Sequence, residues 1–336
     1  MFKFYKLIFF MTMIIGSLIT ISSYSWMSMW MGLEVNLLSI IPLLKKSNNK
    51  FPAESAFKYF VVQSIASTLF LFSMILNCNL IDQINDFSSK IINTIFFISI
   101  LMKIGSAPFH AWFPEVLEGL SWGNCFLMMT WQKIAPMIIL LQNFKMTNLI
   151  IMVIIFSSFL SSILGLNQIS LRKIMAYSSI NHISWMLSSI SSTKIIWLIY
   201  FLIYSLISLV IIFSLNYSNT YFLHQMKIFS SNKPLNLMIN LNFLSLGGLP
   251  PFLGFYPKWL TINYLNFINH YILTLILILF TLIFLFIYTR IMFSSMTLLM
   301  VENKNIDFIN KTPTLMFLNM GILMMILFSP VMFNYL

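Results

Sequence analysis

Long apolar runs recur from one end of the 336-residue chain to the other, and they restrict the fold more than any other feature. A helix crosses the hydrocarbon core of a bilayer with about 20 predominantly apolar residues, whereas a membrane β-barrel needs shorter, alternating segments. Hydrophobic residues make up 59% of the chain and charged residues only 8%, against about 25% charged residues in soluble domains. The sequence therefore predicts an all-α, polytopic membrane protein.

Eleven segments are predicted as transmembrane helices from their length and apolar content. Their approximate boundaries are 7–24, 26–44, 54–76, 91–112, 121–142, 147–166, 174–190, 194–216, 235–265, 271–293 and 314–335. The ninth segment is too long and too interrupted to form one straight helix. Because eleven is an odd number, we expect the two ends of the chain on opposite sides of the membrane.

Basic residues between these segments or close to their ends predict the orientation. The loops on the N-terminal side carry thirteen, namely Lys3, Lys6, Lys45, Lys46, Lys50, Lys58, Arg172, Lys173, Lys227, Lys233, Arg290, Lys304 and Lys311. The opposite side carries three, namely Lys90, Lys145 and Lys194. By the positive-inside rule, the N-terminus faces the inner, electrically negative compartment. Since the basic residues lie in short loops, we attribute the net charge of +11 to topology and predict no nucleic-acid binding.

Four residues that are charged at neutral pH lie away from the ends of the predicted spans. Glu34 lies eight residues after the start of its span, and Lys103 and Lys133 each lie twelve residues into theirs. At 1.5 Å per residue these three sit near the middle of the membrane, and Lys258 lies in the long ninth segment. A charge at the centre of a helix costs about 2.5–3.5 kcal/mol, so four unpaired charges would cost roughly 10 kcal/mol. This cost favours a functional role.

Lysine suits proton transfer in such a position. Loss of hydration favours the neutral amine and a nearby carboxylate favours the ammonium, so a movable negative charge can switch a buried lysine. Arginine stays charged, and neither Arg172 nor Arg290 lies at the centre of a predicted span. Two alternatives remain at this point: long side chains that extend to the membrane surface, and ion pairs with a purely structural role.

Two predicted spans contain the same short pattern, G-x-x-P-F, at residues 105–109 and 248–252. Proline removes a helical hydrogen bond and clashes with the preceding turn, so both spans are predicted to be kinked or unwound. The copies lie five spans apart. A unit of five helices crosses the membrane an odd number of times, so a second copy in tandem has the opposite orientation. This predicts two inverted repeats, over about 7–142 and 147–293, and an added helix at 314–335. This arrangement is typical of secondary transporters, although proline kinks alone are common in membrane helices.

Two histidines are further candidates. His110 follows the first break and is a candidate proton relay at a channel mouth, and His182 lies inside the span 174–190. Either histidine is equally compatible with a packing role. The sequence contains no G-x-x-x-x-G-K-S/T or G-x-G-x-x-G nucleotide motif, no His, Cys and carboxylate cluster with metal spacing, and no recognisable nucleophilic triad. We therefore predict no cofactor or metal bound by this chain.

Six blocks of the sequence together resemble one known family. They are WMGLEVNLLSIIP, ESAFKYFVVQ, MKIGSAPFHAWFPE, TWQKIAP, LNQISLRKIMAYSSINHISWM and LSLGGLPPFLGFYPKW, in this order within about residues 26–260. They look like the subunit 2 family of mitochondrial NADH:ubiquinone oxidoreductase (respiratory complex I), whose members are antiporter-like and related to Mrp-type cation/proton antiporters. The richness in Phe, Ile, Met, Asn and Lys is similar to that of AT-rich animal mitochondrial genes, including those of insects.

The resemblance assigns roles to the four residues inside the spans. Family members translocate protons with a glutamate on an early helix and lysines along a central hydrophilic axis. Glu34 in G-L-E matches that glutamate, and Lys103 matches the lysine of the first broken helix. Lys133 in W-Q-K matches the central lysine, and Lys258 in P-K-W matches the lysine after the second break.

The resemblance also implies the setting of the chain. Residues 1–336 would form a single antiporter-like domain in the mitochondrial inner membrane, with the N-terminus in the matrix and the C-terminus in the intermembrane space. Its partners would be other membrane-arm subunits, including neighbouring antiporter-like subunits, and inner-membrane lipids such as cardiolipin. NADH, FMN, iron–sulfur clusters and ubiquinone would bind to other subunits. The alternatives are an Mrp-type cation/proton antiporter subunit and a purely structural membrane-arm subunit.

Overall fold

A computed structural model describes residues 4–45, 50–79, 86–142, 147–226 and 233–296. In these ranges the chain forms helices and no β-strand, so the predicted all-α class is confirmed. The helices are α1 (Phe4–Ser22), α2 (Trp26–Leu44), α3 (Lys50–Asn79), α4 (Asp86–Ile104), α5 (Trp112–Gly119), α6 (Trp122–Met129), α7 (Trp131–Gln142), α8 (Asn148–Leu166), α9 (Leu171–Ile190), α10 (Lys194–Tyr217), α11 (Lys233–Gly247), α12 (Phe255–Phe267) and α13 (Tyr271–Met296).

Seven helical segments in the described ranges are long and apolar enough to cross a membrane. They are Phe4–Ser22, Trp26–Leu44, Phe51–Asn77, Trp122–Gln142, Asn148–Leu166, Lys194–Tyr217 and Tyr271–Met296. The predicted spans 91–112, 174–190 and 235–265 are also helical, but two of them are broken and the third is rich in polar residues. The predicted span 314–335 lies outside the described residues. A count of eleven crossings therefore stays a prediction.

Both segments that carry G-x-x-P-F are interrupted, as predicted. The helix α4 ends just before Gly105 and α11 just before Gly248, and these glycines have φ angles of 79° and 80°. The backbone N–H of each glycine donates to a carbonyl in the last helical turn, Leu101 O at 3.0 Å and Leu244 O at 3.2 Å. A left-handed glycine is a common end of a helix, because a side chain would be strained there.

A third interruption was not predicted from the sequence. The expected span 121–142 consists of α6 and α7, which are separated at Thr130. The Thr130 hydroxyl donates to Phe126 O at 2.8 Å, and the backbone of Thr130 has φ −116° and ψ −71°. Threonine hydroxyls that bond to a carbonyl one turn earlier often bend helices. The interruption at Thr130 precedes Lys133 by three residues, less than one helical turn.

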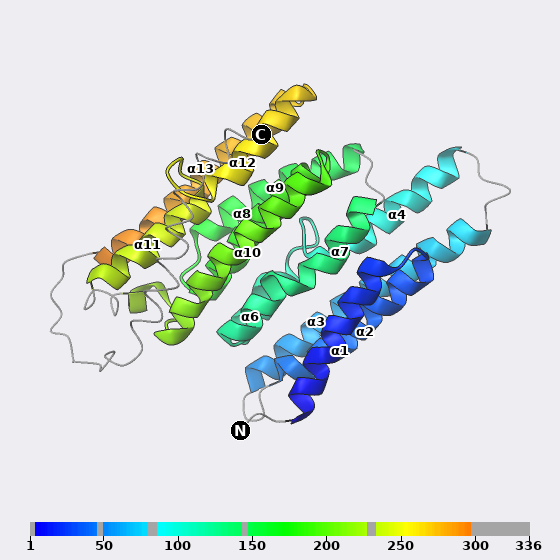
Figure 1. Cartoon of the computed structure of the whole chain (residues 1–336), viewed down its shortest axis with the longest axis horizontal. Helices are drawn as coiled ribbons and strands as arrows, with labels where there is room; N and C mark the ends of the chain where they lie inside the picture. Colours follow the sequence, from blue (N-terminus) through cyan, green and yellow to red (C-terminus); the bar gives the residue numbers. More distant parts are fainter. Residues whose placement is uncertain (1–3, 46–49, 80–85, 143–146, 227–232, 297–336) are drawn as a thin grey trace. The chain divides into compact units, whose positions relative to one another are not determined.

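The helices form two compact units that divide after Val153. In the first unit α1 packs along α2, and α3 packs against α2, α4 and α5 (Figure 1). The helix α7 packs against α1, α4 and α6. These contacts place α2, α4 and α7, which carry Glu34, Lys103 and Lys133, in one helical bundle.

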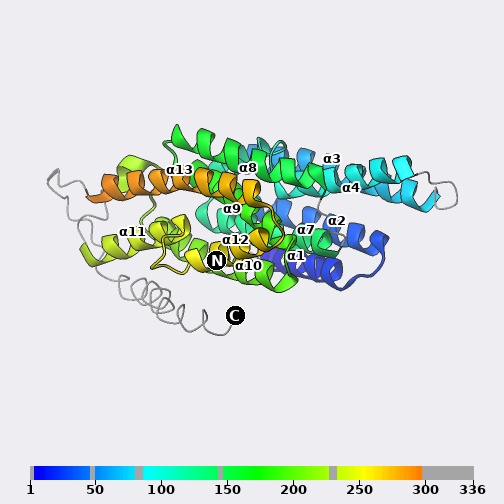
Figure 2. The same ribbon diagram turned by 90° about the horizontal axis from the view of Figure 1, so that it is seen from above.

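In the second unit α9 is the central helix. It contacts α10, α12 and α13, and nearly all of its side chains are buried. Figure 2 shows α13 running along α11 and α12. Five buried serines of α9 donate their hydroxyls to carbonyls three residues earlier, namely Ser178, Ser179, Ser184, Ser188 and Ser189. A polar helix is stable in this place because these groups are hydrogen-bonded locally.

Arg290 ties α13 to the end of α8. Its guanidinium donates to Leu166 O at 2.6 Å and to Gln168 O at 3.1 Å, where helical carbonyls lack partners. Hydrogen bonds from charged groups contribute about 1.5–3 kcal/mol each when buried, and Arg290 is half-buried.

We expect Arg290→Met to lower the free energy of unfolding by about 2 kcal/mol, measured as a lower thermal midpoint in detergent. Lys194→Met, at an exposed position, should leave the midpoint unchanged, and equal midpoints for both variants would contradict this role.

Candidate functional site

The first unit buries two of the predicted lysines. The side chains of Lys103 on α4 and Lys133 on α7 are 7% and 2% exposed. Neither position fits a lysine that extends to the membrane surface. The structure thus places both side chains inside the helical bundle, and their roles stay predictions.

Glu34 on α2 is partly exposed. In the part of the chain that the structure describes, no salt bridge joins its carboxylate to Lys103. Unit charges inside a protein interact over distances longer than a salt bridge, because an effective dielectric near 20 screens them less than water does. Contact is therefore not required for the charge of Glu34 to influence the protonation of Lys103.

Lys133 faces an aromatic ring. Its Nζ lies 5.1 Å from the centroid of Phe113 on α5, a distance at which the face of the ring attracts a cation. An ion pair 2.6 Å long joins Glu115 on the same short helix to Lys58 on α3, with both side chains about half exposed. The helix α5 is thereby linked to α3, and its Phe113 is 1% exposed.

A group of neutral polar side chains lies beside these ionisable residues. Asn36 and Gln132 exchange two hydrogen bonds, of 3.1 Å from Asn36 Nδ2 to Gln132 Oε1 and 3.0 Å from Gln132 Nε2 to Asn36 Oδ1. The Tyr59 hydroxyl donates to the same Gln132 Oε1 at 3.3 Å. Gln63 donates to the backbone carbonyl of Lys103 at 3.1 Å. Polar contacts therefore connect α2, α3, α4 and α7.

The second unit positions Lys258 at the break between α11 and α12. Its Nζ donates to Gly247 O at 2.8 Å and to Leu246 O at 3.3 Å, and the side chain is 6% exposed. These carbonyls belong to the end of α11, where the helix dipole favours a cation. The same Nζ lies 5.9 Å from the ring centroid of Trp185 on α9. The break thus supplies both the space and the acceptors for this ammonium.

His182 lies in the interior of the second unit. Its side chain is 6% exposed, and its Nδ1 lies 2.9 Å from the hydroxyl of Tyr200 on α10. Tyr204 lies one turn further along α10, and its ring centroid is 4.9 Å from the centroid of the imidazole ring. Because histidine and tyrosine both donate and accept hydrogen bonds, the pair forms a polar contact inside an apolar helical bundle.

His110 lies in the first break, between α4 and α5, and is partly exposed. Its Nδ1 is 3.3 Å from Pro108 O. The structure therefore places the two candidate histidines in different surroundings. A residue near the surface of the first unit suits the predicted relay at a channel mouth, whereas His182 suits an internal relay.

The sequence pointed to the ionisable residues but missed their neutral neighbours. Asn36 lies two residues after Glu34, and Gln132 immediately precedes Lys133. Polar residues inside apolar runs were the available signal, and only the charged ones were singled out. Phe113 and Tyr200 carried no such signal, because aromatic residues are frequent throughout this chain.

Comparison with known proteins agrees with this architecture. Residues 23–285 match the family described as NADH:quinone oxidoreductase/Mrp antiporter, TM. The chain is similar to NADH-ubiquinone oxidoreductase chain 2 of Anopheles gambiae, with 46% identity over 293 residues that cover 85% of this chain and 84% of the relative. The corresponding protein of Mus musculus is 37% identical over 325 residues, 94% of either chain. The fold matches a chain of respiratory complex I from Thermus thermophilus with bound aureothin, with a TM-score of 0.86, 20% identity, and coverage of 98% of this chain and 79% of that chain.

Proposed function

Because this chain belongs to the NADH:quinone oxidoreductase/Mrp antiporter family of membrane proteins, we propose that it is a proton-translocating subunit of the membrane arm of respiratory complex I. It contributes to the NADH:ubiquinone reductase reaction as part of the complex, without a redox site of its own. The observation that carries this proposal is the burial of Lys103, Lys133 and Lys258. Their burial is costly unless the charges are paired or functional.

The proposed architecture consists of two inverted five-helix repeats within one antiporter-like domain, 1–336, together with an eleventh span at 314–335. Two observations support it. The chain divides into compact units after Val153, close to the predicted boundary between 142 and 147. Each unit also contains one helix that ends at a glycine with a φ angle near 80°.

In the proposed mechanism Glu34 and Lys103 act as a coupled pair. A change of charge at the boundary of the subunit, driven by quinone reduction elsewhere in the complex, alters the state of this pair. The altered field changes the protonation of Lys133, and Lys258 takes the proton onward for release to the intermembrane space. His182 and His110 act as relays. A buried lysine can serve here because loss of hydration favours its neutral form and a neighbouring carboxylate its charged form.

The proposal extends to the surroundings of the chain. The subunit lies in the mitochondrial inner membrane with its N-terminus in the matrix, contacts neighbouring antiporter-like subunits, and is surrounded by lipids such as cardiolipin. NADH, FMN, iron–sulfur clusters and ubiquinone bind to other subunits. Native electrophoresis of solubilised mitochondrial membranes tests this directly, since an antibody to this chain should detect it at the position of NADH:ubiquinone reductase activity.

The Mrp-type antiporter is the second candidate, because the matching family includes Mrp antiporters. A chain that migrates apart from the reductase activity and catalyses sodium-dependent proton transport in vesicles would favour it. A third possibility is a subunit whose buried charges only hold helices together. Unchanged pumping after replacement of Glu34, Lys103, Lys133 and Lys258 would favour that structural role.

The contact between His182 and Tyr200 leads to a prediction for the second unit. Tyr200→Phe removes only the hydroxyl that lies 2.9 Å from His182 Nδ1. A typical hydrogen bond contributes about 1 kcal/mol, or about fivefold in an equilibrium constant. We expect about fivefold slower proton pumping by the assembled complex in vesicles, because the imidazole loses the group that orients it.

The matched control is Tyr288→Phe. Tyr288 on α13 is equally buried, and its ring packs against Phe243 and Phe284. We expect this variant to pump like the wild type. Equal pumping by both variants at the wild-type rate would show that His182 needs no orientation by Tyr200.

A further inference from the structure

The reciprocal amide pair in the first unit connects two helices that carry proposed proton-transfer residues. Asn36 lies two residues after Glu34 on α2, and Gln132 lies immediately before Lys133 on α7. The helix α7 packs mainly against α1, α4 and α6. The two hydrogen bonds between Asn36 and Gln132, at 3.1 and 3.0 Å, are therefore a direct side-chain link between α2 and α7.

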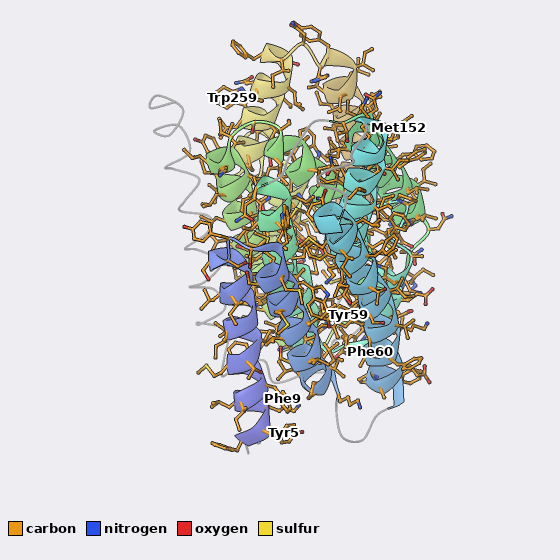
Figure 3. All side chains as sticks on the ribbon, turned by 90° about the vertical axis from the view of Figure 1, so that its right-hand side faces the viewer. Tyr5, Phe9, Tyr59, Phe60, Met152 and Trp259 are labelled. Carbon is orange, nitrogen blue, oxygen red and sulfur yellow. The ribbon has the colours of Figure 1, made fainter. Side chains whose placement is uncertain are left out.

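Tyr59 completes this link from α3. Its hydroxyl donates to the Gln132 oxygen that already accepts from Asn36. Figure 3 shows Tyr59 and Phe60 at successive positions of α3, and their exposures are 3% and 39%. Asn36 is 4% exposed. Gln132 is partly exposed, so the trio lies at the edge of the interior, with Asn36 and Tyr59 on its buried side.

The chemistry of this trio differs from that of its ionisable neighbours. An amide keeps the same charge throughout the physiological pH range, so the pair gains or loses no proton during transport. Two amides exchange two hydrogen bonds only when donors and acceptors face each other at a fixed separation. A pair of this kind is strengthened by surroundings of low dielectric constant. It holds α2 and α7 together and adds no charge near Lys133.

We propose that Asn36, Gln132 and Tyr59 form an amide clamp whose function is to transmit the state of Glu34 on α2 to Lys133 on α7. A displacement of α2 that accompanies a change in the Glu34–Lys103 pair reaches α7 through the clamp and changes the position of the Lys133 ammonium over Phe113. The three are positioning residues, since none carries the proton. This inference rests on the proposed proton-translocating function.

The test uses the assembled complex reconstituted into vesicles, with protons pumped per NADH oxidised as the readout. Gln132→Met preserves approximate length and removes both amide hydrogen bonds. We expect this ratio to fall at least twofold while NADH oxidation continues. Asn36→Leu should have the same effect, and Tyr59→Phe, which keeps the amide pair, a smaller effect in the same direction.

A length exchange separates transmission from packing. Asn36→Gln combined with Gln132→Asn keeps both amides and the sum of the two side-chain lengths. We therefore expect the double variant to pump better than Asn36→Gln alone or Gln132→Asn alone. Asn124→Leu is the matched control, because Asn124 on α6 donates to Leu43 O on α2 at 3.2 Å. This substitution removes a hydrogen bond between α2 and α6 and leaves the clamp intact. A complex that carries it should pump normally.

The outcomes distinguish this inference from the function on which it rests. If Lys133→Ala lowers the pumping ratio and Gln132→Met does not, the clamp is refuted and the proposed function stands. If Lys133→Ala also pumps normally, the proposed function itself is wrong. If Gln132→Met and Asn36→Leu both prevent assembly of the complex, the double variant with exchanged side-chain lengths decides. Restored assembly and pumping then support the clamp, whereas failure to restore either overturns it.

Discussion

Replacing Lys133 by alanine should abolish proton pumping, with at least a tenfold loss per assembled complex in vesicles. Lys133 is 2% exposed, and its Nζ lies over the ring of Phe113. No other lysine of the described first unit shares this position, because Lys103 lies on α4 and Lys58 at the half-exposed surface. Without an ionisable group on α7, the proposed path has no site that responds to the Glu34–Lys103 pair.

Two further variants make this prediction specific. Lys133→Met keeps most of the side-chain volume and should lose pumping as fully as Lys133→Ala, which excludes a cavity as the cause. Lys58→Met removes a lysine of the same unit whose ion pair with Glu115 is about half exposed. Since exposed ion pairs contribute about 0–1 kcal/mol, this control should pump nearly normally. Full pumping by an assembled Lys133→Ala complex would refute the proposed role of the lysine.

Replacing Gly248 by alanine should reduce proton pumping about fivefold or more. The glycine has a φ angle of 80°, where an L side chain costs about 1–2 kcal/mol. An added Cβ would also lie 2.9 Å from both Cδ and Nζ of Lys258. The lysine would have to move away from the Gly247 and Leu246 carbonyls that accept its hydrogen bonds. The Lys258 ammonium would then no longer occupy the break, and the proposed proton path would lose its last lysine.

Gly123→Ala is the matched control for this substitution. A Cβ at Gly123, in α6, meets no atom within 4 Å, and its φ angle is not positive. Gly123 lies in the first turn of α6, where alanine meets no steric obstacle, so this complex should assemble and pump normally. Pumping by Gly248→Ala at the same rate as Gly123→Ala would show that the geometry around Lys258 is not required.

The apolar runs and the G-x-x-P-F patterns were sufficient to predict the helical class and the two broken segments. Each of these features depends on local chemistry: an apolar run of about 20 residues suits a bilayer, and glycine and proline end helices through their own backbone geometry. Thr130 was missed because a threonine hydroxyl bonds either to its own helix or elsewhere, and only the surrounding packing decides which. The predicted span 121–142 therefore consists of α6 and α7.

The sequence by itself determined that this chain is a helical membrane protein with costly ionisable residues at Glu34, Lys103, Lys133 and Lys258, because hydropathy and charge are properties of the residues alone. Only the tertiary structure decided what surrounds each of them. The ring of Phe113 lies over Lys133, the carbonyls at the end of α11 accept from Lys258, and an amide pair joins α2 to α7. The last contact joins residues that are 96 positions apart. Such contacts depend on how helices pack against each other, and no local pattern in a single sequence specifies them.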